Sequence, residues 1–197
     1  MGEVYNLGSL LNLMCRETSG DEVSVEDLLN VVGRRAYGPV LLLLGFIAVS
    51  PLSIVPGLNW ITALITLLFA VQIIIGWKRP WIPARILRIR FPRKYLVQGV
   101  EASQPYVHRI DAFLKPRLTM LTEPPFVQLV AMVCAAAALV TFPLGLIPFG
   151  PTLPGLTILF MGLGLASRDG FMLLLAGCAL VGAVLVTMRA WSALPFT

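Results

Sequence analysis

The residues best suited to binding chemistry in this chain flank two short segments rich in proline and glycine. Residues 51–57 contain two prolines and a glycine, and residues 143–151 contain three prolines and two glycines. Such a density of helix breakers ends one helix and exposes the backbone N–H groups at the start of the next. Helix N-termini attract anions, and unwound carbonyl groups bind cations. The candidates for ligand contact are Ser53, Gly57, Asn59, Phe149, Gly150 and Thr152.

Acid–base and nucleophilic chemistry has few candidate residues here. The apolar stretches 36–77, 124–167 and 170–188 contain no Asp, Glu, Lys, Arg or His. Catalysis within a membrane needs a group of that kind, so we do not expect an enzyme. Arg168 and Asp169 adjoin these stretches, and we weigh a gate or proton-handling pair against an interfacial salt bridge and helix cap. One histidine and three scattered cysteines favour neither a metal site nor a cofactor.

The composition predicts an integral membrane protein. The 197 residues are 57% hydrophobic and 13% charged, and the mean hydropathy is +0.85. Soluble domains carry about 25% charged residues. The uncharged stretches are long enough for helices of about 20 residues, the length that crosses a bilayer. We therefore expect an all-α, polytopic membrane protein.

Each of the two longest apolar stretches reads as two helices separated by a break. We expect helices over 37–50 and 58–76, over 126–142 and 152–166, and a last helix over 171–189. The first helix, about 21 Å long, is short for a hydrocarbon core of about 30 Å. A break at membrane depth, in a re-entrant hairpin, accounts for this length. The alternative is that both breaks are ordinary turns in water.

The two breaks also predict a diverged internal repeat. An offset of 92 residues aligns Pro51 with Pro143 and Pro56 with Pro148. Repeated broken helices are typical of transporter folds. The alternative is that prolines simply mark the turns between spans.

Two amphipathic segments precede the first apolar stretch. Residues 3–15 and 24–32 have apolar side chains at helical spacing, and Ser24 and Asp27 form a predicted capping box. We expect both helices at the membrane surface, or else packed against a soluble partner. The predicted organisation is therefore interfacial helices over 1–35, a first hairpin over 36–77, a basic centre over 78–122, and a second hairpin with the final helix over 123–197.

The basic centre predicts the orientation in the membrane. Residues 78–117 contain ten basic and two acidic residues, a net charge of +8, and five prolines that predict only short helices. The positive-inside rule places this segment in the cytoplasm. The charges either set topology alone or hold an anionic lipid or lipid-linked sugar. The candidates for that contact are Arg79, Arg85, Arg88 and Arg90.

The expected partners follow from the membrane assignment. Membrane lipids are expected, and nucleic acid is not. Small residues in the last helix allow close helix contact within or between chains, which makes a homodimer one option. These residues are Cys178, Ala179, Gly182 and Ala183.

Three sequence motifs carry a resemblance to a known family. They are Arg-Pro-Trp-Ile-Pro at 79–83, Lys-Pro-Arg-Leu at 115–118, and Pro-Phe-Gly-Pro-Thr-Leu-Pro at 148–154, which Arg168-Asp169-Gly170 follows. On these residues the sequence resembles the ExoD family of bacterial exopolysaccharide-synthesis membrane proteins, over about residues 24–190. The resemblance implies an inner-membrane protein associated with exopolysaccharide production.

Two roles are compatible with this expectation. The first is a transporter-like protein with ligand contacts at the two breaks. The second is a non-transporting accessory subunit that docks a polysaccharide synthase or a lipid-linked sugar carrier.

Overall fold

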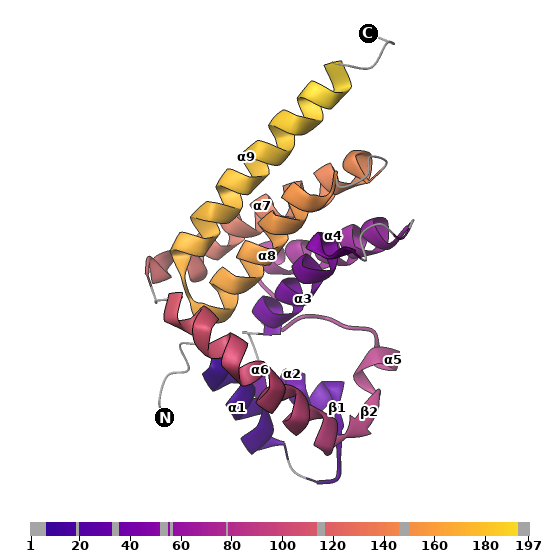
Figure 1. The fold of residues 1–197 in the computed structure, drawn as a ribbon, viewed down its shortest axis with the longest axis vertical. Coiled ribbons are helices and arrows are strands. Elements are labelled where there is room, and N and C mark those ends of the chain that lie inside the picture. Colours follow the sequence, from indigo (N-terminus) through magenta and orange to yellow (C-terminus); the bar gives the residue numbers. More distant parts are fainter. Residues whose placement is uncertain are drawn as a thin grey trace.

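The protein is an all-α polytopic membrane protein. A bundle of apolar helices adjoins a smaller group of helices and two short strands, which we call the layer (Figure 1). The computed structural model describes residues 7–18, 20–32, 36–51, 55, 57–77, 79–113, 117–145 and 150–192. The bundle consists of α3 (Tyr37–Val49), α4 (Leu58–Ile75), α7 (Phe126–Leu144), α8 (Thr152–Ser167) and α9 (Gly170–Ser192). These bounds confirm the predicted helices to within a few residues.

The layer combines segments from before and after the first hairpin. It contains α1 (Leu7–Glu17), β1 (Glu22–Ser24), α2 (Val25–Val32), α5 (Ala84–Leu87), β2 (Arg90–Pro92) and α6 (Arg93–Phe113). β1 pairs antiparallel with β2, with Val23 opposite Phe91. The backbone N–H of Gly8 in α1 donates to the Asp111 carboxylate of α6 at 2.9 Å. The first hairpin therefore begins and ends on the same side of the bundle.

The predicted capping box at the start of α2 is confirmed. The Asp27 N–H donates to Ser24 Oγ at 3.1 Å, and the Ser24 N–H donates to Asp27 Oδ2 at 3.0 Å. This reciprocal pair satisfies two backbone donors that a helix N-terminus otherwise leaves unbonded.

The prediction of only short helices in the basic centre is wrong. α6 is 21 residues long and contains Pro105. An internal proline removes one helical hydrogen bond, but packing of α6 on α1, where Val100 is buried, supports the helix on both sides of it. Pro83 and Pro92 directly precede α5 and α6, where a missing N–H removes no helical bond.

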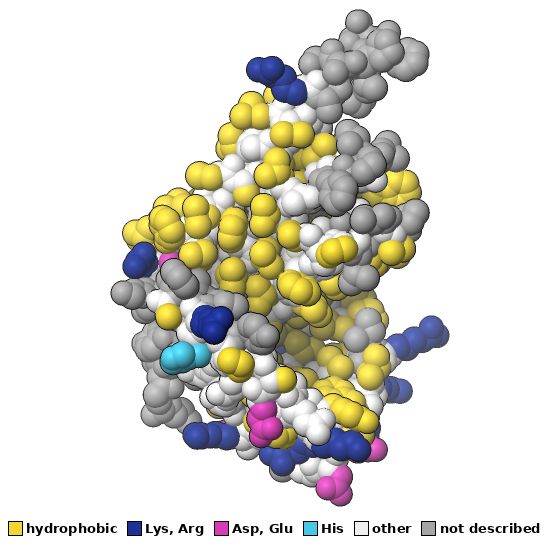
Figure 2. Space-filling view, in the orientation of Figure 1, with side chains coloured by type: hydrophobic (Ala, Val, Ile, Leu, Met, Phe, Trp, Pro, Cys, Tyr) yellow, Lys and Arg dark blue, Asp and Glu magenta, His cyan; other side chains and the backbone are white. Residues whose placement is uncertain are grey.

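The membrane helices differ in length. α4, α7 and α9 are long and apolar enough to cross a membrane, whereas α3 and α8 are shorter. At 1.5 Å per residue, α3 and α8 extend about 20 and 24 Å. Hydrophobic side chains dominate the face that Figure 2 shows over the bundle, and Lys and Arg side chains gather over the layer.

Glycines join the two hairpins along α3 and α8. A Cβ atom built on Gly38 would lie 2.6 Å from the Ala166 backbone nitrogen, and one on Gly162 would collide with the Leu42 backbone. Small residues at a helix crossing allow the backbones to approach closely. α3 and α8 therefore pack antiparallel in direct backbone contact.

The hairpins also meet along α4 and α7, so the first helix of each hairpin packs against the second helix of the other. The ends of α3 and α7 and the starts of α4 and α8, which flank the two breaks, lie at the end of the bundle that is remote from the layer (Figure 1). At that end Gly155 lies against Ala48, and Gly145 lies against the indole of Trp60. The two breaks are therefore neighbours.

Candidate ligand site between the two hairpins

The candidate residues Gly57, Asn59, Gly150 and Thr152 are described, and they lie at or directly before the starts of α4 and α8. Gly57 precedes α4 with a φ of 87°, in the left-handed region that favours glycine. Asn59 is buried in the first turn of α4, and Thr152 is half-buried at the start of α8. Gly150 lies in the turn before α8. Ser53 and Phe149 lie outside the described residues.

A buried polar face of α4 runs from the break into the bundle. Asn59, Thr62 and Thr66 are buried and lie on one face of the helix. The hydroxyls of Thr62 and Thr66 donate to the carbonyl oxygens of Leu58 and Thr62, each at 2.8 Å. Their oxygen lone pairs therefore line an otherwise apolar helix interface.

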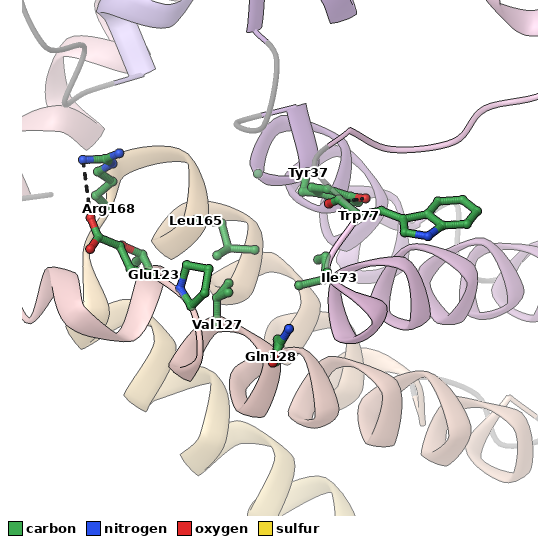
Figure 3. A pocket seen from close by; sticks show the side chains of 12 residues that line it. Tyr37, Ile73, Trp77, Glu123, Val127, Gln128, Leu165 and Arg168 are labelled. Atoms are coloured by element: carbon green, nitrogen blue, oxygen red, sulfur yellow. Dashed lines mark hydrogen bonds and ion pairs between the residues drawn. The ribbon is translucent and has the colours of Figure 1, made fainter.

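At the opposite end of the bundle, the two hairpins enclose a cavity of about 550 Å³ (Figure 3). It lies beside the layer, and its walls come from α3, α4, α7, α8 and the turns next to them. The lining residues include Tyr37, Ile73, Gly76, Glu123, Val127, Gln128, Leu165 and Arg168. Sequence reasoning did not find this cavity.

One signal in the sequence could have found the cavity. The 92-residue offset that aligns the two breaks also aligns Ile73 with Leu165 and Gly76 with Arg168. All four residues line the cavity. The offset therefore relates residues of the two hairpins that line the same cavity.

Tyr37, at the start of α3, is hydrogen-bonded to the segment that follows α4. Its hydroxyl donates to the Trp77 carbonyl oxygen at 3.3 Å. Its ring meets Phe69 edge-on, with centroids 6.4 Å apart and planes at 80°. The Tyr37 ring thus forms part of the cavity wall, while the indole of Trp77 points away from Glu123 and Arg168 (Figure 3).

A clamp holds the chain just after α4. Gln72 Oε1 accepts the Trp81 N–H at 2.6 Å, and Gln72 Nε2 donates to the Trp81 carbonyl oxygen at 3.3 Å. Gln72 is buried, so these two bonds satisfy a carboxamide that has little access to water. The clamp fixes the path of the chain from the bundle into the layer.

The second hairpin places a loose ion pair at the cavity. A guanidinium nitrogen of Arg168 lies 4.0 Å from Glu123 Oε1, and the two side chains are 31% and 59% exposed. Solvent screens a pair of this exposure, so it contributes about 0–1 kcal/mol to stability. A ligand can therefore replace either partner at little cost.

The Arg168-Asp169-Gly170 motif builds the turn between α8 and α9. Asp169 is fully buried, and its carboxylate accepts the Phe171 N–H at 3.0 Å, which caps the start of α9. The Gly170 N–H donates to the Arg117 carbonyl oxygen at 2.6 Å. The structure shows the helix cap and pairs Arg168 with Glu123, and a gate or proton-handling role of Arg168 and Asp169 stays a prediction.

The four arginines expected to contact anionic lipid lie in the layer, away from the cavity. Arg79, Arg85, Arg88 and Arg90 are all exposed. A guanidinium nitrogen of Arg79 donates to Asn30 Oδ1 at 3.0 Å, which ties the end of the first hairpin to α2. Within the described ranges, no group of three or more His, Cys, Asp or Glu residues could hold a metal ion.

Comparison with known proteins gives two matches. The family described as "Exopolysaccharide synthesis, ExoD" matches residues 7–189. The chain is also 31% identical to "Protein ExoD" of Rhizobium meliloti (strain 1021) over 169 residues, which covers 85% of this chain and 70% of that protein. No solved structure matches the chain.

Proposed function

Because the chain belongs to the ExoD exopolysaccharide-synthesis family, we propose that it is a transporter-like protein of the bacterial inner membrane. In this proposal it moves a small ligand along the interface between its two hairpins in support of exopolysaccharide synthesis. The observation that carries the proposal is the position of the cavity. It lies at one end of this interface, and the two breaks lie at the other end.

The buried polar face of α4 supports a path between these two ends. Asn59, Thr62 and Thr66 extend from the first break toward the cavity. The Tyr37–Phe69 ring pair then lies between Thr66 and the cavity. In this structure the hairpin interface is hollow at the cavity end, which is an arrangement expected of one state of an alternating-access protein.

Helix length and hairpin pairing support re-entrant repeats. A helix of about 20 Å, such as α3, ends before it has crossed a core of about 30 Å. Irregular backbone at that depth must be enclosed by protein, and Trp60 lies against Gly145 where the breaks meet. The matched pairs α3–α8 and α4–α7 fit two repeats that enter from the same side.

The exposed charges support an orientation with the layer in the cytoplasm. Arg85, Arg88 and Arg90 are exposed on the segment that contains α5 and β2. Under the positive-inside rule, this orientation makes the cavity open toward the cytoplasm.

A second candidate function rests on the same arginines. They lie close together in sequence and, in the part of the chain that the structure describes, make no ion pair. An accessory subunit could use this basic segment to dock a polysaccharide synthase or a lipid-linked sugar carrier.

Thiol accessibility distinguishes transport from a static scaffold. Cys15, Cys134 and Cys178 are replaced by alanine, single cysteines are placed at Asn59 and Thr152, and a membrane-impermeant thiol reagent is added from each side. Transport predicts slow or partial labelling that changes when a ligand is added. Complete protection from both sides favours the accessory role, and immediate labelling from the outside alone means that the breaks are ordinary turns in water.

A further inference from the structure

We infer that the cavity between the hairpins binds a neutral hexose unit, a free sugar or the sugar head of a larger molecule. This inference rests on the proposed function, since it names the class of ligand that the cavity takes. Its volume of about 550 Å³ is within the range of about 300–1,000 Å³ that is typical of small-molecule sites.

The polar lining of the cavity suits hydroxyl groups. Among the described residues, none forms a hydrogen bond with the Gln128 carboxamide, so its donor and its acceptor both remain for a ligand or water. Arg168 adds donors in a fixed plane, and Glu123 adds acceptors. A sugar hydroxyl both donates and accepts, so neighbouring hydroxyls can use all three side chains together.

The apolar lining suits the C–H face of a sugar ring. Ile73, Val127, Leu165 and the ring of Tyr37 line the cavity, and Figure 3 shows the three aliphatic side chains between the Glu123–Arg168 pair and Trp77. The polar side chains of Glu123 and Arg168 lie at its more exposed edge. A pyranose has the same division, because its C–H bonds form faces and its hydroxyl groups form the rim.

The charge of the lining favours a neutral ligand. One guanidinium, of Arg168, and one carboxylate, of Glu123, line the cavity, and they already form an ion pair. A phosphate held by Arg168 would lie close to the negative charge of Glu123, which repels it. The exposed arginines Arg85, Arg88 and Arg90, whose charge suits a phosphate, lie on the segment of α5 and β2 in the layer, outside the cavity lining.

The test is ligand-detected NMR on the full chain in lipid nanodiscs. Saturation-transfer signals are recorded for D-glucose and D-galactose, with inorganic phosphate as a competitor. We expect saturable hexose binding that phosphate does not displace. Gln128→Leu should weaken it about tenfold, the effect of losing a hydrogen bond to a buried ligand. Gln98→Leu is the matched control, because Gln98 is exposed on α6 and should leave binding unchanged.

A second variant keeps the test decisive if Gln128→Leu does not fold. Val127→Phe fills the apolar side of the cavity and should abolish hexose binding. Absence of hexose binding to the wild type, equal binding by the Gln128→Leu variant, or displacement by phosphate would each overturn the inference. Hexose binding together with full thiol protection at the breaks supports the sugar site and overturns only transport. Ligand-dependent labelling without hexose binding supports transport and overturns the sugar site.

Discussion

Gly76 and Arg168 occupy equivalent places in the two hairpins. Each ends the second helix of its hairpin in the left-handed conformation, with φ of 87° and 55°, and both line the cavity. They are separated by the 92 residues that also align Pro51 with Pro143. Glycine has no side chain at this place in the first hairpin, whereas the second hairpin carries the guanidinium of Arg168, so only the second hairpin brings a charge to the cavity at this position.

Arg168→Gly should lower exopolysaccharide yield without unfolding the protein. Glycine adopts a positive φ without the cost of about 1–2 kcal/mol that other residues incur, and the lost ion pair is worth at most about 1 kcal/mol. We expect thermal stability in detergent to be equal or higher, and exopolysaccharide yield to fall. Gly76→Ala is the complementary variant and should lower stability by about 1 kcal/mol or more. A large loss of stability in the Arg168→Gly variant would show that the side chain is structural.

Gly162→Ala should destabilise the protein by about 1–3 kcal/mol, because the new Cβ would collide with the Leu42 backbone at the α3–α8 crossing. The control is Gly177→Ala in α9, where a Cβ atom meets nothing within 4 Å. That control should be as stable as the wild type or more stable, since alanine within a helix is more favourable than glycine by about 0.5–1 kcal/mol. Denaturation in detergent, followed by circular dichroism, measures both. Equal stability of the two variants would contradict the close crossing.

Lowering the pH should fray the start of α2. The hydrogen bonds from the Ser24 hydroxyl and backbone hold the pKa of Asp27 below its ordinary value, with a smaller contribution from the charge of Arg90. A lowered carboxylate pKa contributes stability that is present above the ordinary value, about 4, and is lost as the pH falls through the lowered value. NMR titration of Asp27 measures the shift. Ser24→Ala should return the pKa toward its ordinary value, and an unchanged pKa in that variant would contradict the capping box.

Asn59→Leu and Thr152→Val should lower exopolysaccharide yield at unchanged protein level if ligand passes the breaks. Thr187→Val is a matched control, because Thr187 lies on α9 and its hydroxyl donates to the Ala183 carbonyl oxygen at 2.8 Å. Exopolysaccharide is measured per unit of membrane-inserted protein.

Charge reversal of Arg85, Arg88 and Arg90 tests the accessory role in the same assay. These residues lie outside the cavity lining, so transport predicts a near-normal yield, provided that the topology is retained. An accessory role predicts the opposite result, in which charge reversal lowers the yield and the variants at the breaks do not.

Local signals made the bundle helices and the α2 cap predictable. Pro51 follows the end of α3 and Gly57 precedes the start of α4, and both residue types act on the local backbone without help from tertiary packing. Ser24 caps α2 by accepting a hydrogen bond from the backbone N–H of Asp27, three residues later. The prediction of α6 failed at Pro105, because the packing that supports a helix through a proline comes from another part of the chain.

Features that depend on distant residues could not be predicted in this way. β1 and β2 are three residues each, and Ser24 pairs with Arg90 across the whole first hairpin. The cavity needs four helices to be paired correctly before Gln128 and Arg168 share a wall. Arg168 was a candidate because of its charge, whereas Gln128 has no local feature that distinguishes it from other polar residues.

The pairing of β1 with β2, and of Gly8 with Asp111, also fixes an order of events during synthesis. Residues 22–24 leave the ribosome long before residues 90–92, and the first hairpin lies between them. The layer therefore cannot close until residues 36–77 have been made and the end of α4 lies on the same side of the bundle as the start of α3. A chain whose first hairpin had crossed a bilayer completely would leave β1 and β2 on opposite faces, where they could not pair.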